Sequence, residues 1–230
     1  MNMKKFIAVV VFSCVCWLSA FSHDGAAYRR DFEKNWEEGE TYASEIRPLL
    51  LTSLGDPLLT SVGMAVVFPE LSRYSYIQDV AETSALELFY VMYGRGNFSI
   101  GKFQMKPSFA VMIEKDADDD CRLAYPSLFE KGKNEKEDRA LRIARLRSLP
   151  RQVEYFAVFL RIMSSRFPSF MEDPHKMVQI FSAAYNSGYD KSMERLEDYI
   201  DFCYFPYGYL GRKEQYAYCD IALLYYRENE

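Results

Sequence analysis

Residues 56–70 read Asp-Pro-Leu-Leu-Thr-Ser-Val-Gly-Met-Ala-Val-Val-Phe-Pro-Glu, in which the start signal of a helix is followed by a mostly apolar run. Asp56 is a good helix N-cap, and Pro57 suits the first helical position. No charged residue follows until Glu70. A helix that is apolar on all sides is normally buried. The stretch therefore predicts a buried helix that carries a glutamate near its end.

Other segments have apolar residues at helical spacing, whereas the regions between them are rich in turn-forming or charged residues. The expected helices cover residues 31–50, with Pro48 as a limit, and residues 77–93, 107–114, 135–149, 153–163 and 176–185. Residues 94–101 contain three glycines and predict a loop with short extended pieces. Residues 115–136 are charged and predict a surface excursion. The expected fold is mainly α, with a small extended element.

The N-terminus has the pattern of a secretory signal peptide. Lys4 and Lys5 precede an apolar run, and Ala20-Phe21-Ser22 provides small residues for cleavage near Ser22. We therefore expect residues 1–22 to be removed and the protein to be periplasmic or secreted. No second apolar run of membrane-spanning length follows. In the remaining chain, residues 23–54 are expected to form a helical segment that packs on the main domain, residues 55–230.

Charge argues against a nucleic-acid partner. The chain has 28 basic and 33 acidic side chains, a net charge of -5. Removal of residues 1–22 takes away two lysines and no acids, so that 26 − 33 gives -7. Proteins that bind polyanions usually present a basic surface. Protein partners are left open by the sequence.

Cysteine and histidine usage argues against a metal site. Cys121, Cys203 and Cys219 remain after residue 22, without a C-x-x-C motif, and the histidines are His23 and His175. This set does not supply the usual spacing of zinc ligands, and we expect neither a metal nor a cofactor. In an oxidising compartment, Cys203 and Cys219 are the better candidates for a disulfide.

Two later segments carry the chemical signal. One is Gly101-Lys102-Phe103-Gln104-Met105-Lys106-Pro107, and the other is Ala184-Tyr185-Asn186-Ser187-Gly188. They resemble the Gly-x-x-Gln-x-x-Pro and Ala-Tyr-Asn-Ala-Gly motifs of lytic transglycosylases of the lysozyme superfamily, with Ser187 in place of the usual Ala. Each motif is short, but their order and separation also match. The resemblance covers about residues 56–189. The family that these residues resemble includes the soluble lytic transglycosylases and the goose-type lysozymes.

The resemblance implies a lysozyme-like domain with a small β or extended element beside an active-site cleft. It implies cleavage of the β-1,4 glycosidic bond between N-acetylmuramic acid and N-acetylglucosamine in peptidoglycan. A single glutamate would donate a proton and later accept one, giving 1,6-anhydromuramoyl ends. Such an acid needs an apolar surround that raises its pKa.

Three glutamates could be that acid. Glu70 ends the apolar helix, and the sequence around it resembles the family pattern of an apolar run, Glu, a small residue, Arg and an aromatic residue. Glu82 has the longer spacing of goose-type lysozymes, and Glu87 has the common spacing before Gly101. Both would lie within a helix rather than at its end. We favour Glu70, which requires an inserted helix before Gly101.

The resemblance also assigns substrate-binding roles. Gln104 would hydrogen-bond the glycan, and Tyr185 and Asn186 would orient the acid or line its subsite. Ser99 is a further hydrogen-bonding candidate, and Gly101 would allow the backbone to approach a sugar closely.

Two alternatives remain at this level. A hydrolytic lysozyme would usually need a second carboxylate in the cleft, and residues 97–104 contain none. A lysozyme-like protein that binds a glycan or a partner without cleaving it would not need any of the three glutamates in a cleft with Gln104 and Tyr185. The position of these carboxyl groups therefore separates an enzyme from a binding protein.

Overall fold

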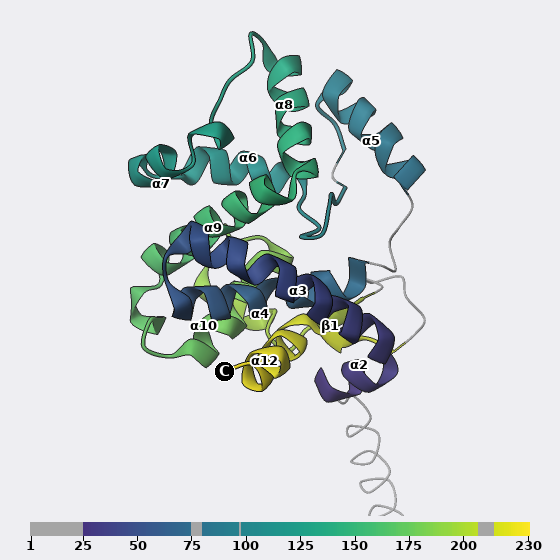
Figure 1. The fold of residues 1–230 in the computed structure, drawn as a ribbon, viewed down its shortest axis with the longest axis vertical. Coiled ribbons are helices and arrows are strands. Elements are labelled where there is room, and N and C mark those ends of the chain that lie inside the picture. The colour runs from purple at the N-terminus through teal and green to yellow at the C-terminus, as the bar shows by residue number, and fades with distance from the viewer. Residues whose placement is uncertain (1–24, 75–79, 97, 207–213) are drawn as a thin grey trace, which may run out of the picture.

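The computed structural model describes residues 25–74, 80–96, 98–206 and 214–230, and it is mainly helical, as predicted (Figure 1). The expected signal peptide, residues 1–22, lies outside the described residues. The elements are α2 (Gly25–Asp31), α3 (Glu33–Leu54), α4 (Pro57–Arg73), α5 (Val80–Tyr93), α6 (Pro107–Asp116), α7 (Asp119–Ala124), η2 (Pro126–Leu128), α8 (Glu135–Arg147), α9 (Leu149–Arg166), η3 (Pro168–Phe170), α10 (Pro174–Ser187), α11 (Met193–Asp198), β1 (Cys203–Phe205), β2 (Tyr216–Ala217) and α12 (Tyr218–Glu228).

Helix α4 is the buried helix predicted from residues 56–70. The Asp56 side chain accepts a hydrogen bond from the Leu59 amide at 2.9 Å and caps the helix, and Pro57 takes the first position. Every residue from Val62 to Ser72 is buried. Helices α3, α9, α10 and α12 pack against α4, so it is surrounded by protein on several sides.

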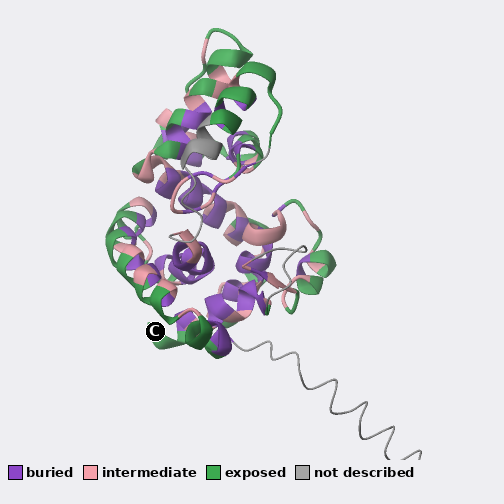
Figure 2. Cartoon of the chain, turned by 90° about the vertical axis from the view of Figure 1, so that its right-hand side faces the viewer, coloured by how far each residue is buried: buried purple, intermediate pink, exposed green. Residues whose placement is uncertain are grey.

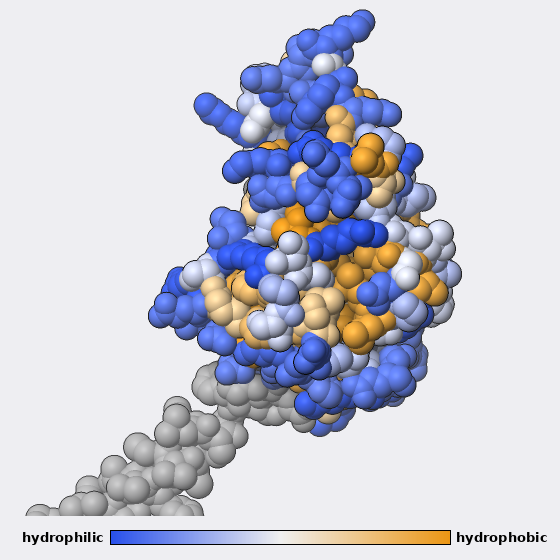
Figure 3. All heavy atoms as spheres, turned by 90° about the vertical axis from the view of Figure 1, so that its left-hand side faces the viewer, coloured by the Kyte–Doolittle hydropathy of each residue, from blue (hydrophilic) through white to orange (hydrophobic). Residues whose placement is uncertain are grey.

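The helices form two groups (Figure 1). One contains α3, α4, α10 and α12, and the other contains α5, α6 and α8. Helix α9 contacts α3 and α4 on one side and α6 and α8 on the other, which joins the groups. Buried residues run through this centre while exposed residues cover the outer surfaces (Figure 2). Viewed from the α7 side, the top of the molecule is hydrophilic and apolar side chains gather lower down (Figure 3).

The N-terminal segment belongs to the same core. Trp36, Ile46 and Leu50 of α3 are buried in the common hydrophobic cluster. The expected limit at Pro48 was wrong, because α3 continues to Leu54. Leu50 and Leu54 face the core, and their burial offsets the backbone hydrogen bond that Pro48 cannot make.

Two further expectations needed correction or refinement. The extended element near residues 94–101 is a bridge between Ile100 and Met105, and a separate antiparallel pair joins β1 to β2. The expected surface excursion at residues 115–136 contains α7 and η2, which bury Cys121, Tyr125 and Leu128. Charged residues cover only the outside of this segment.

Among the described helices, none combines the length and apolar character needed to cross a bilayer.

The predicted disulfide is absent from the structure. Neither Cys203 nor Cys219 takes part in a disulfide, and the buried Cys121 does not either. The Cys219 Sγ faces the Gln179 carbonyl oxygen of α10 at 3.4 Å, and the Cys203 Sγ lies 3.6 Å from the Asp201 carbonyl oxygen. Across the β1–β2 pair, Cys203 stands opposite Ala217 rather than Cys219. The expectation rested on cysteine count, which does not determine this register.

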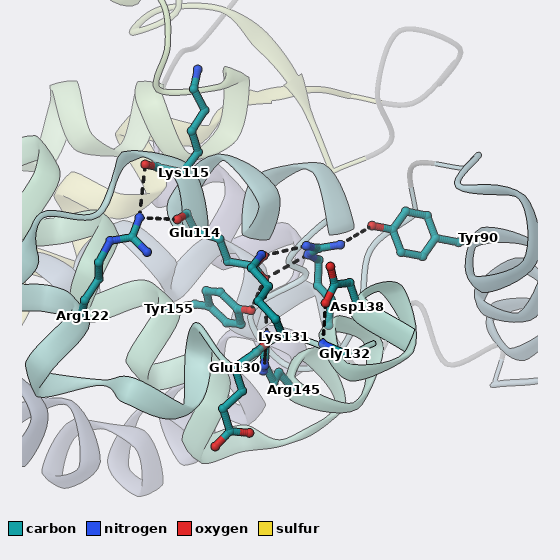
Figure 4. Close-up of polar contacts among 11 residues, drawn as sticks. Tyr90, Glu114, Lys115, Arg122, Glu130, Lys131, Gly132, Asp138, Arg145 and Tyr155 are labelled. Atoms are coloured by element: carbon teal, nitrogen blue, oxygen red, sulfur yellow. Dashed lines mark hydrogen bonds and ion pairs between the residues drawn. The ribbon is translucent and has the colours of Figure 1, made fainter. Parts of the chain in front are cut away.

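A buried charge cluster centred on Glu114 of α6 joins the second group of helices (Figure 4). The carboxylate accepts hydrogen bonds from Arg142 Nε at 3.0 Å, Arg142 Nη2 at 2.6 Å and Tyr155 Oη at 2.7 Å. Arg142 Nη1 also donates to Tyr90 Oη at 3.0 Å. Arg145 Nη1 lies 3.6 Å from the same carboxylate. The Glu114 carboxylate therefore connects α6 to α8 and α9, and Arg142 extends the cluster to Tyr90 of α5.

Replacing Glu114→Gln is predicted to lower the free energy of unfolding by about 3 kcal/mol, because it leaves buried arginine charge without its partner. Urea denaturation measures this change. The control is Arg195→Gln, which breaks an exposed pair with Asp198 and should cost no more than about 1 kcal/mol. Equal effects of the two substitutions would contradict the structural role of the cluster.

Candidate functional site

A cavity of about 540 Å³ lies where α4, the Ile100–Met105 turn, α6, the end of α10 and β1 meet. Its lining consists of Glu70, Arg73, Ser99, Gln104, Met105, Lys106, Ser108, Phe109, Met112, Tyr185, Asn186, Ser187, Gly188, Tyr189, Asp190, Tyr204 and Phe205. The structure thus brings together five residues singled out from the sequence, which are Glu70, Ser99, Gln104, Tyr185 and Asn186. Gly101 is not part of this lining.

Glu70 reaches the cavity from the last turn of α4 and is only 6% exposed. Arg73, one turn later, donates from Nη2 to Glu70 Oε2 at 2.7 Å. The Arg73 guanidinium is held in turn by the Pro206 carbonyl oxygen, 3.2 Å from Nη1, and by the ring of Phe205, 5.1 Å below it. The C-terminal part of the chain therefore orients the cation beside the carboxylate.

Burial raises the pKa of the Glu70 carboxyl group above its ordinary value of 4.5. Desolvation is the largest cause, since it penalises the charged form. Arg73 lowers the pKa through its charge and hydrogen bond, and Lys106 lowers it through its charge, but the net direction is upward. A buried carboxyl group with a raised pKa can hold its proton at a higher pH than an exposed glutamate, as a proton donor requires.

The turn between Ile100 and Met105 presents Gln104 to the cavity. The two end residues exchange backbone hydrogen bonds of 2.9 and 3.2 Å. Gln104 has a positive φ of 49°, and its Nε2 donates to the Gly101 carbonyl oxygen at 2.8 Å. One amide N–H is used within the turn, and the carbonyl oxygen and the other N–H are left as the groups that can contact a ligand.

The close approach that Gly101 allows in the structure is that of a protein side chain, and the expected approach of a sugar stays a prediction. The φ of Gly101 is 69°, and a Cβ at this position would overlap the side-chain amide nitrogen of Gln152. Gln152 is buried on α9, accepts from the Phe103 amide at 3.1 Å and donates to the Ile100 carbonyl oxygen at 3.4 Å and to the Leu146 carbonyl oxygen. Gly101 thus allows a close approach of α9 to the turn.

Tyr185 holds the other side of the same turn. Its hydroxyl donates to the Phe103 carbonyl oxygen at 2.7 Å, while its ring packs edge-on against Phe109 and Phe156. Burial, with the charge of Glu70 as a smaller cause, raises the pKa of Tyr185 well above its ordinary value. The phenol therefore stays protonated and fixes the turn relative to α10. Asn186, next in the helix, also lines the cavity.

The other two glutamates stand on α5, which contributes no described residue to the cavity. Glu87 is buried and accepts a hydrogen bond from Arg147 Nε of α8 at 3.1 Å. This ion pair gives Glu87 a structural role. The side chain of Glu82 lies outside the described residues. Of the two candidates whose side chains the structure describes, Glu70 is the one whose carboxyl group is placed in the cavity with Gln104 and Tyr185.

Several site residues were not assigned a role from the sequence. Arg73 could have been found from its i,i+3 spacing to Glu70, which puts the two side chains on one helix face. Asp190, two residues after the Ala184–Gly188 motif, supplies a second carboxyl group to the cavity lining. Gln152 had no sequence signal, because the backbone groups of the turn that it bonds lie 49 and 52 positions away in the chain. Within the described residues, no group of three or more His, Cys, Asp or Glu residues is arranged to hold a metal ion.

Comparison of the chain with protein-family models, with curated proteins and with solved structures found no match. The chemistry of the site is therefore inferred from its own residues.

Gly101→Ala is predicted to lower the free energy of unfolding by about 3 kcal/mol, since it adds backbone strain and displaces the hydrogen bonds of Gln152. Gly55→Ala is the matched control: Gly55 has a φ of 68°, but no atom lies within 4 Å of an added Cβ. It should cost about 1 to 2 kcal/mol.

Denaturant unfolding of Gly101→Ala and Gly55→Ala separates the cost of backbone strain, which both variants carry, from the cost of the clash with Gln152, which only Gly101→Ala carries. If Gln152 causes the difference, the extra cost of Gly101→Ala over Gly55→Ala should shrink when it is measured in a Gln152→Ala background. Equal costs of the two glycine substitutions would show that Gln152 does not hold the turn.

Proposed function

We propose that the protein cleaves the β-1,4 bond between N-acetylmuramic acid and N-acetylglucosamine in peptidoglycan, with Glu70 as the single general acid and base. The observation that carries this proposal is the meeting of a buried glutamate with Gln104, Tyr185 and Asn186 around one cavity. These residues come from separate segments, each of which resembles a lytic transglycosylase motif in the expected order. A lysozyme-like domain belongs to the same proposal.

In the first step the Glu70 carboxyl group gives its proton to the bridging glycosidic oxygen as the bond from that oxygen to C1 of the muramoyl residue breaks. The raised pKa of Glu70 supports this role, because the acid must be protonated when the glycan binds. As positive charge develops at C1, the Glu70 carboxylate lies beside the sugar and can stabilise that charge. Arg73 stabilises the carboxylate after the proton has left.

In the second step the Glu70 carboxylate takes the proton of the sugar's own C6 hydroxyl group while O6 forms a bond to C1. The product is a 1,6-anhydromuramoyl end, and Glu70 is again protonated. No water is consumed. Gln104, Ser99 and Asn186 are the polar residues of the lining proposed to hydrogen-bond the sugar and hold C6 near C1.

A hydrolytic lysozyme is the second candidate, and Asp190 is the observation that favours it. This residue lines the same cavity as Glu70, and a second carboxylate could direct a water molecule to C1. The hydrolase would give reducing ends in place of anhydro ends. The two reactions share Glu70 as the acid and differ in their dependence on Asp190.

A peptidoglycan substrate agrees with the export predicted from residues 1–22, because the substrate lies outside the cytoplasmic membrane. The periplasmic or secreted location is part of the proposal.

Digestion of purified peptidoglycan followed by mass spectrometry tests the assignment. Glu70→Gln keeps the side-chain shape but removes the titrating proton and should lower the yield of anhydromuramoyl ends by about a thousandfold, equivalent to about 4 kcal/mol of barrier. Glu82→Gln should leave the products unchanged. Glu87→Gln is the control for losing a buried carboxylate outside the cavity, since it weakens only the contact with Arg147.

The products also distinguish the alternatives. Reducing ends that disappear in both Glu70→Gln and Asp190→Asn would identify a hydrolase. No product from the wild-type protein would identify a protein that binds without cleaving. Loss of product in Glu82→Gln with full activity in Glu70→Gln would overturn the choice of acid.

The pH profile of cleavage should decline on the alkaline side as Glu70 loses its proton. Arg73 favours the carboxylate form, so Arg73→Gln should raise the pKa of Glu70 further and move the alkaline limb to higher pH. Lys106→Met should move it in the same direction by less, since Lys106 acts through charge alone. Initial rates measured against pH check both shifts, and an unchanged limb in Arg73→Gln would exclude Glu70 as the titrating acid.

A further inference from the structure

Helix α5 turns its apolar side to solvent. Its exposed large side chains are Leu86, Leu88, Phe89, Met92 and Tyr93, and Leu88 and Tyr93 are each 65% exposed. We call these five residues the outer face of α5. A helix that packs on a protein core normally buries such a set and exposes its polar residues. Large exposed apolar side chains gathered on one face are typical of interaction sites.

The inner face of α5 is held by polar contacts. Glu87 is buried against Arg147 of α8, and Tyr90 accepts a hydrogen bond from Arg142 at 3.0 Å. Arg139 Nε also donates to the Val91 carbonyl oxygen at 3.0 Å. These contacts determine which side of the helix faces α8. Rotating α5 to bury its apolar residues would separate the buried Glu87 carboxylate from Arg147 and the Tyr90 hydroxyl from Arg142, so these contacts hold the apolar face outward.

A hollow at the end of this face combines apolar and cationic chemistry. It has a volume of about 380 Å³, and the described residues that line it are Phe89, Tyr93 and Arg95. The two rings lie 5.0 Å apart. Arg95 makes no ion pair or hydrogen bond with the other described residues. Arg147, whose side chain is 56% exposed, lies beside α5 as well.

We propose that the outer face of α5 docks on the surface of a bilayer that contains anionic lipid. Leu, Phe and Met side chains gain free energy when they enter the boundary between head groups and acyl chains, and Tyr is suited to the head-group level. Arg95 lies where it can meet a lipid phosphate while the neighbouring rings contact the apolar part of the same molecule. The charge beside the apolar face is therefore complementary to anionic lipid, despite the acidic net charge of the chain.

This docking is peripheral and uses one face of one helix. It does not depend on glycan cleavage, because α5 contributes no described residue to the cavity. Failure of the proposed enzymatic function would leave the membrane proposal intact, and the reverse also holds.

Vesicle flotation tests the proposal with the chain that starts at His23, so that the apolar N-terminal run cannot contribute and every described residue is retained. The vesicles contain phosphatidylcholine alone or with phosphatidylglycerol. The protein should bind the mixed vesicles more tightly, and added salt should weaken binding. The triple variant Leu88→Ser, Phe89→Ser and Tyr93→Ser should reduce binding at least about tenfold.

Two further variants make the test specific. Leu123→Ser is the matched control, because Leu123 is 80% exposed on α7, and it should bind as the wild type does. Arg95→Gln should lose part of the preference for phosphatidylglycerol while keeping binding through the apolar face. Circular dichroism and thermal unfolding verify that all variants are folded.

The proposal is overturned if the wild-type protein binds neither kind of vesicle, or if Leu123→Ser reduces binding as much as the triple variant. It is also overturned if light scattering shows a dimer that the triple variant converts to a monomer and the wild type does not bind vesicles. In that case the outer face of α5 is covered by a second copy of the chain.

Discussion

The burial of the Glu70 carboxyl group at the end of α4 is the constraint on which the rest of the site depends. Placing a carboxyl group there carries a desolvation cost that raises its pKa, and the neighbouring Arg73 offsets part of that cost. Four helices surround α4, so the carboxyl group has little freedom to move to solvent. The same packing that stabilises the core thus prepares an acid, and stability and chemistry are coupled at this position.

The second constraint is the fixed position of the Ile100–Met105 turn. Gln152 of α9 and Tyr185 of α10 bond the backbone of the turn at Phe103 from two directions. Gly101 makes the close approach of Gln152 to the turn possible. The turn can therefore present Gln104 to the cavity without a long strand to support it. Residues in the two motifs act partly as structure and partly as ligand-facing groups, which the motifs alone do not separate.

Local features of the sequence predicted α4 well, because Asp56, Pro57 and an uncharged run all favour the same buried helix. They also predicted that Glu70, Gln104 and Tyr185 would share one cavity, through the resemblance to known motifs. Gln152 and Asp190 were missed, since their roles depend on which distant backbone or cavity they meet. The Cys203–Cys219 disulfide failed for a related reason, because the strand register that separates them is a tertiary property.

The most direct test of the account is a carbon-13 NMR titration of the glutamate side-chain carboxyl groups in the wild-type protein, with Glu70→Gln used to assign the resonance. The account predicts that Glu70 titrates above its ordinary value of 4.5 and that this transition disappears in the variant. A Glu70 carboxyl group that titrates at or below that value would mean that Arg73 holds it ionised, and it would contradict the role of Glu70 as a proton donor.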